Sequence, residues 1–140
     1  MILLDTSVLS RAFRRSRPGP SEAALRDSLE RLISGKTPLA IPAIVLQEIL
    51  SGIRSEKQFA ELEHKLVSSF QIVHPETAQY LEAASLRNRC LRAGLSVSGV
   101  DCLIAAIAIA GGHRLFAMDE DFESIAKHAA LKLYRGKRNT

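Results

Sequence analysis

The sequence predicts an α/β fold of three layers (α/β/α), in which helices cover both faces of a parallel sheet of four to five short strands. Two observations lead to this prediction. Short apolar segments alternate with longer segments in which apolar residues recur at helical spacing. The short segments also lack an alternating polar face, which is typical of parallel strands buried on both sides. The 140 residues, 46% of them hydrophobic, suit one domain over residues 1–140 with a basic tail at about 135–140.

The first half of the chain starts with an apolar run that ends in an acid. Asp5-Thr6-Ser7 then supplies residue types that favour the start of a helix. Prolines and a glycine interrupt the pattern at 17–20, and Pro42 favours the first turn of a third helix that we expect to run past Gly52. The expected elements are a strand at 2–4, helices at 8–13 and 21–33, a strand at 39–41, and helices at 42–53 and 55–69.

The second half contains the most apolar helix that the sequence predicts. Ser98 favours its start, the residues from Val100 to Ala110 are almost all apolar, and Gly111-Gly112 ends it. A helix that is apolar on all sides is buried in the centre of a fold. The other expected elements are strands at 70–73, 114–118 and 131–134, a long helix at 75–92, and a short helix that begins within 119–122.

Composition excludes several classes of site. The two cysteines, Cys90 and Cys102, are too few and too poorly spaced for a disulfide framework or a thiolate metal site, which favours a reducing cytoplasm. The four histidines are scattered, which argues against zinc, and no Gly-rich phosphate loop or nucleophile elbow is present. The formal charge of +4 permits an anionic partner.

We expect a cytoplasmic protein without a membrane segment. The first residues do not form a charged leader followed by a long apolar stretch, as a secretory signal does. The longest apolar stretch, 103–110, is far shorter than the roughly 20 residues that a membrane span needs.

Four acids stand where the predicted fold brings side chains together. Asp5 ends the first strand and Asp119 the fourth, and the crevice beyond the carboxyl ends of parallel strands is where such folds bind ligands. Asp101 begins the buried helix, and Glu48 lies in an apolar helix, where a carboxylate needs a partner or solvent. Converging carboxylates repel each other unless a cation neutralises them, and oxygen ligands select Mg²⁺ or Mn²⁺. The sequence therefore predicts a divalent metal site.

Each acid taken alone also has a structural explanation. Asp5 can cap the first helix, Ser98-x-x-Asp101 resembles a capping box, and Asp119 or Asp121 can cap the helix after the fourth strand. For any single acid this explanation is at least as good as a catalytic one. The functional interpretation rests on all four acids together.

Four segments around these acids form an ordered set of motifs. They are Met1-Ile-Leu-Leu-Asp-Thr-Ser-Val-Leu9, Gln47-Glu-Ile-Leu-x-Gly52, Asp101-Cys-Leu-Ile-Ala-Ala106 and Leu115-Phe-Ala-Met-Asp-Glu-Asp-Phe122. In this order, over nearly the whole chain, the set resembles the PIN-domain family and specifically its VapC-type toxins. The resemblance implies a PIN-like fold with Asp5, Glu48, Asp101 and Asp119 as the catalytic residues.

The resemblance further implies an endoribonuclease that hydrolyses RNA phosphodiester bonds with water activated by Mg²⁺ or Mn²⁺. Asp5, Asp101 and Asp119 would hold the metal, and Glu48 would complete the site or orient the water. The implied partners are RNA, a VapB-like antitoxin and a second copy of the chain in a homodimer. Arginines at the rim of the acidic pocket would hold RNA, and the candidates are Arg11, Arg14 and Arg15.

The chain departs from the family pattern at two positions. Ser7 stands where the family often has asparagine, and Ala117 stands where a threonine hydroxyl commonly supports the metal site. We therefore expect Thr6 and Ser7 to supply local hydrogen bonds, and Asp121 to act as an auxiliary or capping residue.

Two other functions are compatible with the sequence. One is a catalytically silent PIN scaffold that acts as a binding or regulatory module, for which Ala117 is the only hint. The other is a phosphohydrolase with Asp5 as the nucleophile. That class usually has a second aspartate two residues later, where this chain has Ser7.

Overall fold

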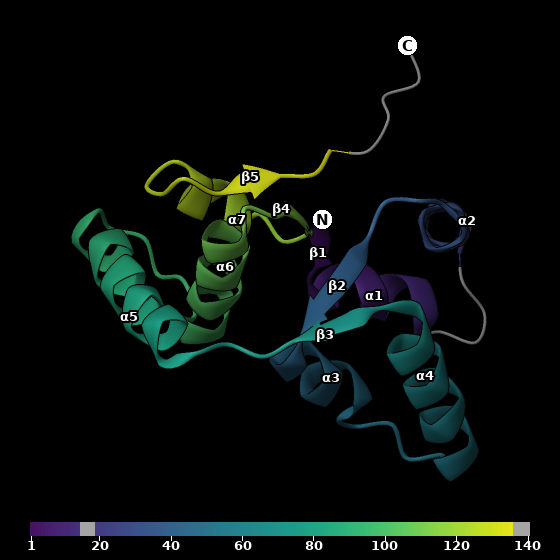
Figure 1. Ribbon diagram of the computed structural model, residues 1–140. Coiled ribbons are helices and arrows are strands. Elements are labelled where there is room, and N and C mark those ends of the chain that lie inside the picture. Colours follow the sequence, from purple (N-terminus) through teal and green to yellow (C-terminus); the bar gives the residue numbers. More distant parts are fainter. Residues whose placement is uncertain (15–18, 136–140) are drawn as a thin grey trace.

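The centre of the protein is one parallel sheet. The computed structural model describes residues 1–14 and 19–135. The strands of the sheet are β1 (Ile2–Leu4), β2 (Leu39–Pro42), β3 (Gln71–Val73), β4 (Arg114–Phe116) and β5 (Lys132–Leu133), in the order β3-β2-β1-β4-β5 (Figure 1). All four pairings are parallel, as the sequence predicts.

The strand order reverses at β1. From β1 the chain adds β2 and β3 on one side, and it then returns to add β4 and β5 on the other side. β1 therefore pairs with both β2 and β4, with Leu3 opposite Ala40 and Leu4 opposite Phe116. In open parallel sheets, ligands bind beyond the carboxyl ends of the strands at such a reversal. The residues that follow β1 and β4 are thus the natural place for a site.

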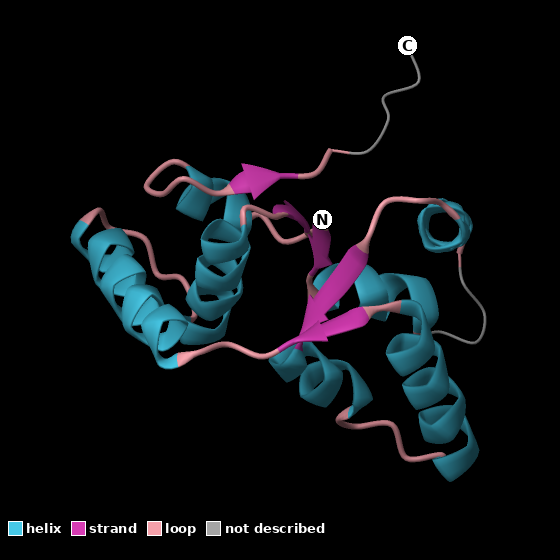
Figure 2. Ribbon diagram, in the orientation of Figure 1, coloured by secondary structure: helices cyan, strands magenta, loops and turns pink. Residues whose placement is uncertain are grey.

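Helices cover both faces of the sheet. They are α1 (Thr6–Phe13), α2 (Pro20–Ser34), α3 (Ala43–Leu50), α4 (Glu56–Ser69), α5 (Thr77–Arg92), α6 (Gly99–Gly111) and α7 (Asp121–Ala126). The first four pack against one another on one side of the strands, and α5, α6 and α7 form a second group on the other side (Figures 1 and 2). This arrangement confirms the predicted three layers. Within the described residues, no helix combines the length and the apolar character that crossing a membrane requires.

Local chemistry sets several helix boundaries. The hydroxyl of Ser55 accepts a hydrogen bond from the backbone of Gln58 at the start of α4, and Gly112, with φ of 65°, ends α6 in the left-handed conformation. The third helix differs from the prediction at both ends. Pro42 is extended and pairs with Val73 in the sheet, so α3 starts one residue later, and α3 ends at Leu50 because Ser51 is already extended.

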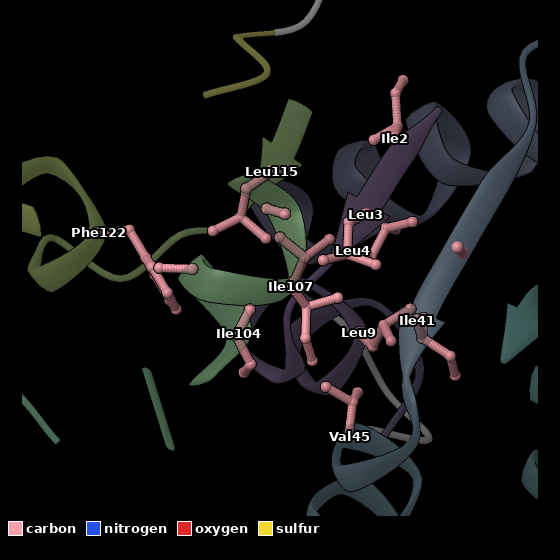
Figure 3. Packing of buried hydrophobic residues seen from close by; sticks show 14 of the residues in the cluster. Ile2, Leu3, Leu4, Leu9, Ile41, Val45, Ile104, Ile107, Leu115 and Phe122 are labelled. Carbon is pink, nitrogen blue, oxygen red and sulfur yellow. The ribbon is translucent and has the colours of Figure 1, made fainter. Parts of the chain in front are cut away.

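The buried hydrophobic residues form one cluster, and the central helix α6 contributes to it beside β1 and β4. Six residues of α6 are buried, which confirms the prediction from its apolar sequence. Figure 3 shows Ile104 and Ile107 of α6 beside Leu4 of β1 and Leu115 of β4. Because α6 packs directly behind these strands, its first turn comes close to their carboxyl ends.

Truncating Leu115 tests this packing. Leu115 is fully buried, so Leu115→Ala is expected to lower the free energy of unfolding by about 2–5 kcal/mol through lost burial and the cavity that remains. Urea denaturation should show a lower midpoint with an unchanged slope. The control is Val67→Ala on α4, where the side chain is 56% exposed and the expected change is within about 0.5 kcal/mol. Similar losses in both variants would contradict this core.

Candidate functional site

Asp5 is a buried carboxylate at the carboxyl end of β1. It is 5% exposed, and its backbone N–H donates to the carbonyl of Phe116 at 3.0 Å, which extends the pairing of β1 with β4. Its Oδ2 accepts hydrogen bonds from the backbone N–H of Ser7 at 3.2 Å and from the Ser7 hydroxyl at 2.7 Å. Asp5 is therefore the N-cap of α1, as its structural explanation requires, and it also lies next to the end of β4.

Asp101 is a partly buried carboxylate in the first turn of α6. The hydroxyl of Ser98 accepts a hydrogen bond from the Asp101 backbone at 3.0 Å, which confirms Ser98 as the helix cap. The pKa of Asp101 is raised from 3.8 to about 7. Burial is the largest cause, the negative charges of Asp5, Asp119 and Asp121 add to it, and a hydrogen bond with Ser98 acts in the opposite direction. Acids from three separate parts of the chain are thus close enough to repel one another.

Asp119 and Asp121 lie where the chain passes from β4 into α7. The Asp119 Oδ1 accepts a hydrogen bond from the backbone N–H of Asp121 at 2.9 Å. Neither residue is the N-cap of α7, because that position is occupied by Glu120, and Asp121 is the first residue of the helix. One carboxylate oxygen from each of Asp101, Asp119 and Asp121 lies within 4.8 Å of the other two, a spacing that can hold a metal ion.

This group of three acids differs in membership from the predicted metal ligands. Asp101 and Asp119 belong to both sets, whereas Asp121 replaces Asp5 among the closest oxygens. The sequence signal for Asp121 is its spacing of two residues from Asp119 beyond a strand end. Asp5 remains close, since its charge acts on Asp101.

Glu48 is held beside the start of α1. Its side chain is exposed on α3, and its Oε1 accepts a hydrogen bond of 2.8 Å from the hydroxyl of Thr6. Helices α1 and α3 pack together, which brings Glu48 to the residue that follows Asp5. The Glu48 carboxylate thus has a hydrogen-bond partner, Thr6, and contact with solvent, which satisfies its charge in an otherwise apolar helix. Glu48 lies outside the group of three acids.

Ser7 connects the ends of the two central strands. Its hydroxyl donates to Asp5 and accepts a hydrogen bond of 3.0 Å from the backbone N–H of Met118. Met118 directly follows Ala117, the position that lacks the hydroxyl common in the family. Ser7 thus places a hydroxyl next to that position and fixes the segment that leads to Asp119.

The arginines proposed from sequence to bind RNA are placed only in part. Arg11 is exposed on α1. Arg14 ends that helix, and its carbonyl accepts a hydrogen bond from the Gln58 side chain at 3.1 Å. Arg15 lies outside the described residues. Contact of these arginines with RNA stays a prediction.

The cysteines offer no alternative chemistry near the acids. Both Cys90 and Cys102 are free and buried. Burial raises the pKa of the Cys102 thiol to about 11, so this residue, although it is next to Asp101, stays protonated at neutral pH and is a poor nucleophile or ligand. The chemistry of the site therefore rests on carboxylates.

Comparison with known proteins agrees with this geometry. The family model described as "PIN domain" matches residues 2–128. The chain is 35% identical over 135 residues to Ribonuclease VapC11 of Mycobacterium tuberculosis and, with the same values, to VapC ribonuclease Mb1587 of Mycobacterium bovis. Each alignment covers 94% of this chain and 96% of the relative.

Solved structures share the fold. VapBC2 from Rickettsia felis, solved bound to a DNA fragment from its promoter, aligns with a TM-score of 0.77 at 24% identity, covering 96% of this chain and 98% of that chain. FitAcB from Neisseria gonorrhoeae aligns with a TM-score of 0.73 at 22% identity, covering 96% of this chain and 97% of that chain. The sheet order, the acids beyond β1 and β4, and a family match over most of the sequence lead to one conclusion: the chain belongs to the PIN domain family.

Proposed function

We propose that this protein is a metal-dependent endoribonuclease and the toxin of a VapBC-type toxin–antitoxin pair. The observation that carries the proposal is the gathering of Asp101, Asp119 and Asp121 beside Asp5, at the reversal point of the sheet. Relatives that are 35% identical along almost the whole chain are named as VapC ribonucleases, which supports RNA as the substrate.

A hard divalent cation fits the residues present. The raised pKa of Asp101 reflects its burial first and then repulsion from the neighbouring carboxylates, and a bound cation would stabilise the ionised form against both. A donor set made only of oxygen atoms favours Mg²⁺ or Mn²⁺ over zinc. We assign Asp101, Asp119 and Asp5 as ligands, with Asp121 as a further oxygen donor. When bound, the metal supplies a hydroxide-like nucleophile at neutral pH and neutralises charge on the phosphoryl oxygens.

The remaining polar residues position these groups. Ser7 holds Oδ2 of Asp5, and the same hydroxyl anchors the segment before Asp119. We assign the other carboxylate oxygen of Asp5, Oδ1, to the cation. Thr6 holds Oε1 of Glu48, and we assign Oε2 of Glu48 to accept a proton from the attacking water. Hydroxyls from the first turn of α1 thus orient acids from two different elements.

Partners follow from the same family relationship. Solved neighbours with this fold include a toxin–antitoxin complex and a member of the VapBC family of toxin–antitoxin systems, which supports a VapB-like antitoxin as a partner of this chain. An arginine of such a partner can pair with the carboxylates. We also propose a homodimer, because the exposed Tyr80 and Leu81 on α5 offer apolar surface for a second copy. We propose a cytoplasmic location, because both cysteines are free, as is usual in a reducing compartment.

The direct test is cleavage of RNA by the purified chain. A labelled single-stranded RNA should be cut in buffer with Mg²⁺ or Mn²⁺, and excess EDTA should reduce the rate to background, since water is not activated without the cation. Returning Mn²⁺ should restore the activity. Intact RNA at every metal concentration, from a folded chain, would favour the silent scaffold. A stable phosphoaspartate at Asp5 would favour the phosphohydrolase.

A further inference from the structure

A small polar cavity adjoins the acidic site on the side of β5. It has a volume of about 70 Å³, and its lining includes Asp119, Met118, Glu123, Tyr134 and Arg135. Because Asp119 also belongs to the group of three acids, the cavity and the acidic site are neighbours. One water molecule needs about 10–15 Å³ of this kind of volume, so the cavity has room for the oxygen atoms of a phosphate group.

The backbone that carries Arg135 is fixed even though it lies near the end of the described chain. The backbone N–H of Tyr134 donates to the carbonyl of Leu115 at 2.7 Å, which continues the pairing of β5 with β4. The ring of Tyr134 packs against Phe116, with 5.0 Å between ring centroids, and Arg114 lies over the same ring at 5.4 Å. These contacts of Tyr134 fix the backbone position from which the side chain of Arg135 starts.

An ion pair with Glu123 of α7 orients the side chain of Arg135. Its Nη1 donates to Oε1 of Glu123 at 2.6 Å, and both side chains are more than half exposed. A guanidinium has five N–H donors, so this single contact leaves several donors for another acceptor. The pairing also offsets the charge of Glu123, one of the acids that would otherwise repel an anion.

We propose that Arg135 binds a backbone phosphate of the RNA, next to the phosphate that is cleaved. The proposal rests on the ribonuclease function proposed above. An acidic site repels a polyanion until cations compensate, and Arg135 is a cation that shares a cavity with Asp119. A phosphate in this cavity would take the free guanidinium donors in the forked geometry that suits arginine. It would fix the register of the strand without reading any base.

The test measures RNA binding without cleavage. Anisotropy of a fluorescein-labelled single-stranded RNA dodecamer is followed with Mn²⁺ in the Asp101→Asn background. Adding Arg135→Gln should weaken binding about fivefold to tenfold at low salt. It should also reduce the slope of log affinity against log salt by about 0.7, the value for one phosphate contact in a single strand. Unchanged affinity and slope would overturn the site.

Two further variants separate a phosphate contact from a structural effect. Lys57→Gln breaks another exposed ion pair, that with Glu61 on α4, and should leave binding and slope unchanged. Glu123→Gln removes the partner of Arg135 but keeps its positive charge, so it should leave binding unchanged or make it tighter. If Glu123→Gln weakens binding as much as Arg135→Gln does, the ion pair is responsible and the proposal is wrong.

The outcome is independent of catalysis. Cleavage is assayed in parallel with chains that keep Asp101. If Arg135→Gln changes neither the affinity nor the salt slope while the native chain still cleaves RNA, only the phosphate site is overturned. No cleavage by the native chain, together with the expected Arg135 effect on binding, overturns the proposed ribonuclease and leaves the phosphate site standing.

Discussion

Replacing Asp101 with asparagine is expected to lower metal-dependent RNA cleavage by about 100-fold or more while the fold stays intact. Loss of residues that merely orient metal ligands costs about 10- to 100-fold, so loss of a ligand should reach at least the upper end. Folding should survive because Ser98 caps α6 through the Asp101 backbone N–H, which asparagine keeps. The measurement is the initial cleavage rate with saturating Mn²⁺.

The same variant should be more stable than the native chain when no metal is present. The folded-state pKa of Asp101, about 7, lies above its ordinary 3.8, so the stability linked to its protonation is complete below about pH 4 and is lost as the pH rises through 7. The shift corresponds to about 4 kcal/mol for a desolvated group, and partial exposure reduces this to about 2 kcal/mol. Urea unfolding with EDTA should show this gain at pH 8 and little gain at pH 4.

A matched control is Asp27→Asn on α2, where the carboxylate is exposed and away from the site. It should change neither the cleavage rate nor the pH dependence of stability. If Asp101→Asn cleaves RNA at the native rate, or if both variants behave alike, the assignment of Asp101 as a ligand is wrong.

Mn²⁺ is expected to stabilise the native chain, and to do so more strongly at pH 8 than at pH 6. A ligand at 100 times its Kd adds about 2.7 kcal/mol, which for a chain of this size raises Tm by roughly 8 °C. The metal binds the ionised form of Asp101, so below pH 7 the Asp101 carboxyl group must lose its proton before the metal can bind. The Kd should therefore weaken by about tenfold for each pH unit below 7 and level off above it.

Thermal unfolding and isothermal titration at pH 6, 7 and 8 measure this directly. The two effects of pH have opposite signs, since rising pH destabilises the metal-free chain through Asp101 and favours the metal-bound chain through the same group. EDTA-treated protein gives the metal-free baseline, and Asp101→Asn should lose most of the pH dependence. An affinity for Mn²⁺ that does not change between pH 6 and 8 would contradict the role of Asp101.

Much of the fold follows from local patterns. The strands and helices of the structure lie within a few residues of the predicted segments, and the all-apolar sequence of α6 correctly indicates a central buried helix. The main departure is α3, where Pro42 joins the sheet instead of the helix. Proline tolerates either position, and the choice is made by pairing with Val73, a residue about thirty positions away that no local pattern contains.

The candidate site was accessible from sequence only in part. Asp5 and Asp119 follow apolar strands, so their meeting at one sheet edge can be predicted. The closeness of Asp121 to Asp101, by contrast, depends on the turn after β4, in which the Asp121 backbone bonds the Asp119 carboxylate. The sequence predicts Asp121 as an auxiliary or capping residue, because the same residue types occur near a helix start whether or not they form the cap.

By itself the sequence determined the order of the elements, the burial of α6, the acids at the strand ends and the membership of the family, because each depends on residue types within a short window. The tertiary structure alone decided that β1 lies between β2 and β4, that Thr6 holds Glu48, that Ser7 reaches Met118 and that Arg135 shares a cavity with Asp119. These contacts join residues far apart in the chain, and the order and register of the strands, which periodicity does not encode, bring them together.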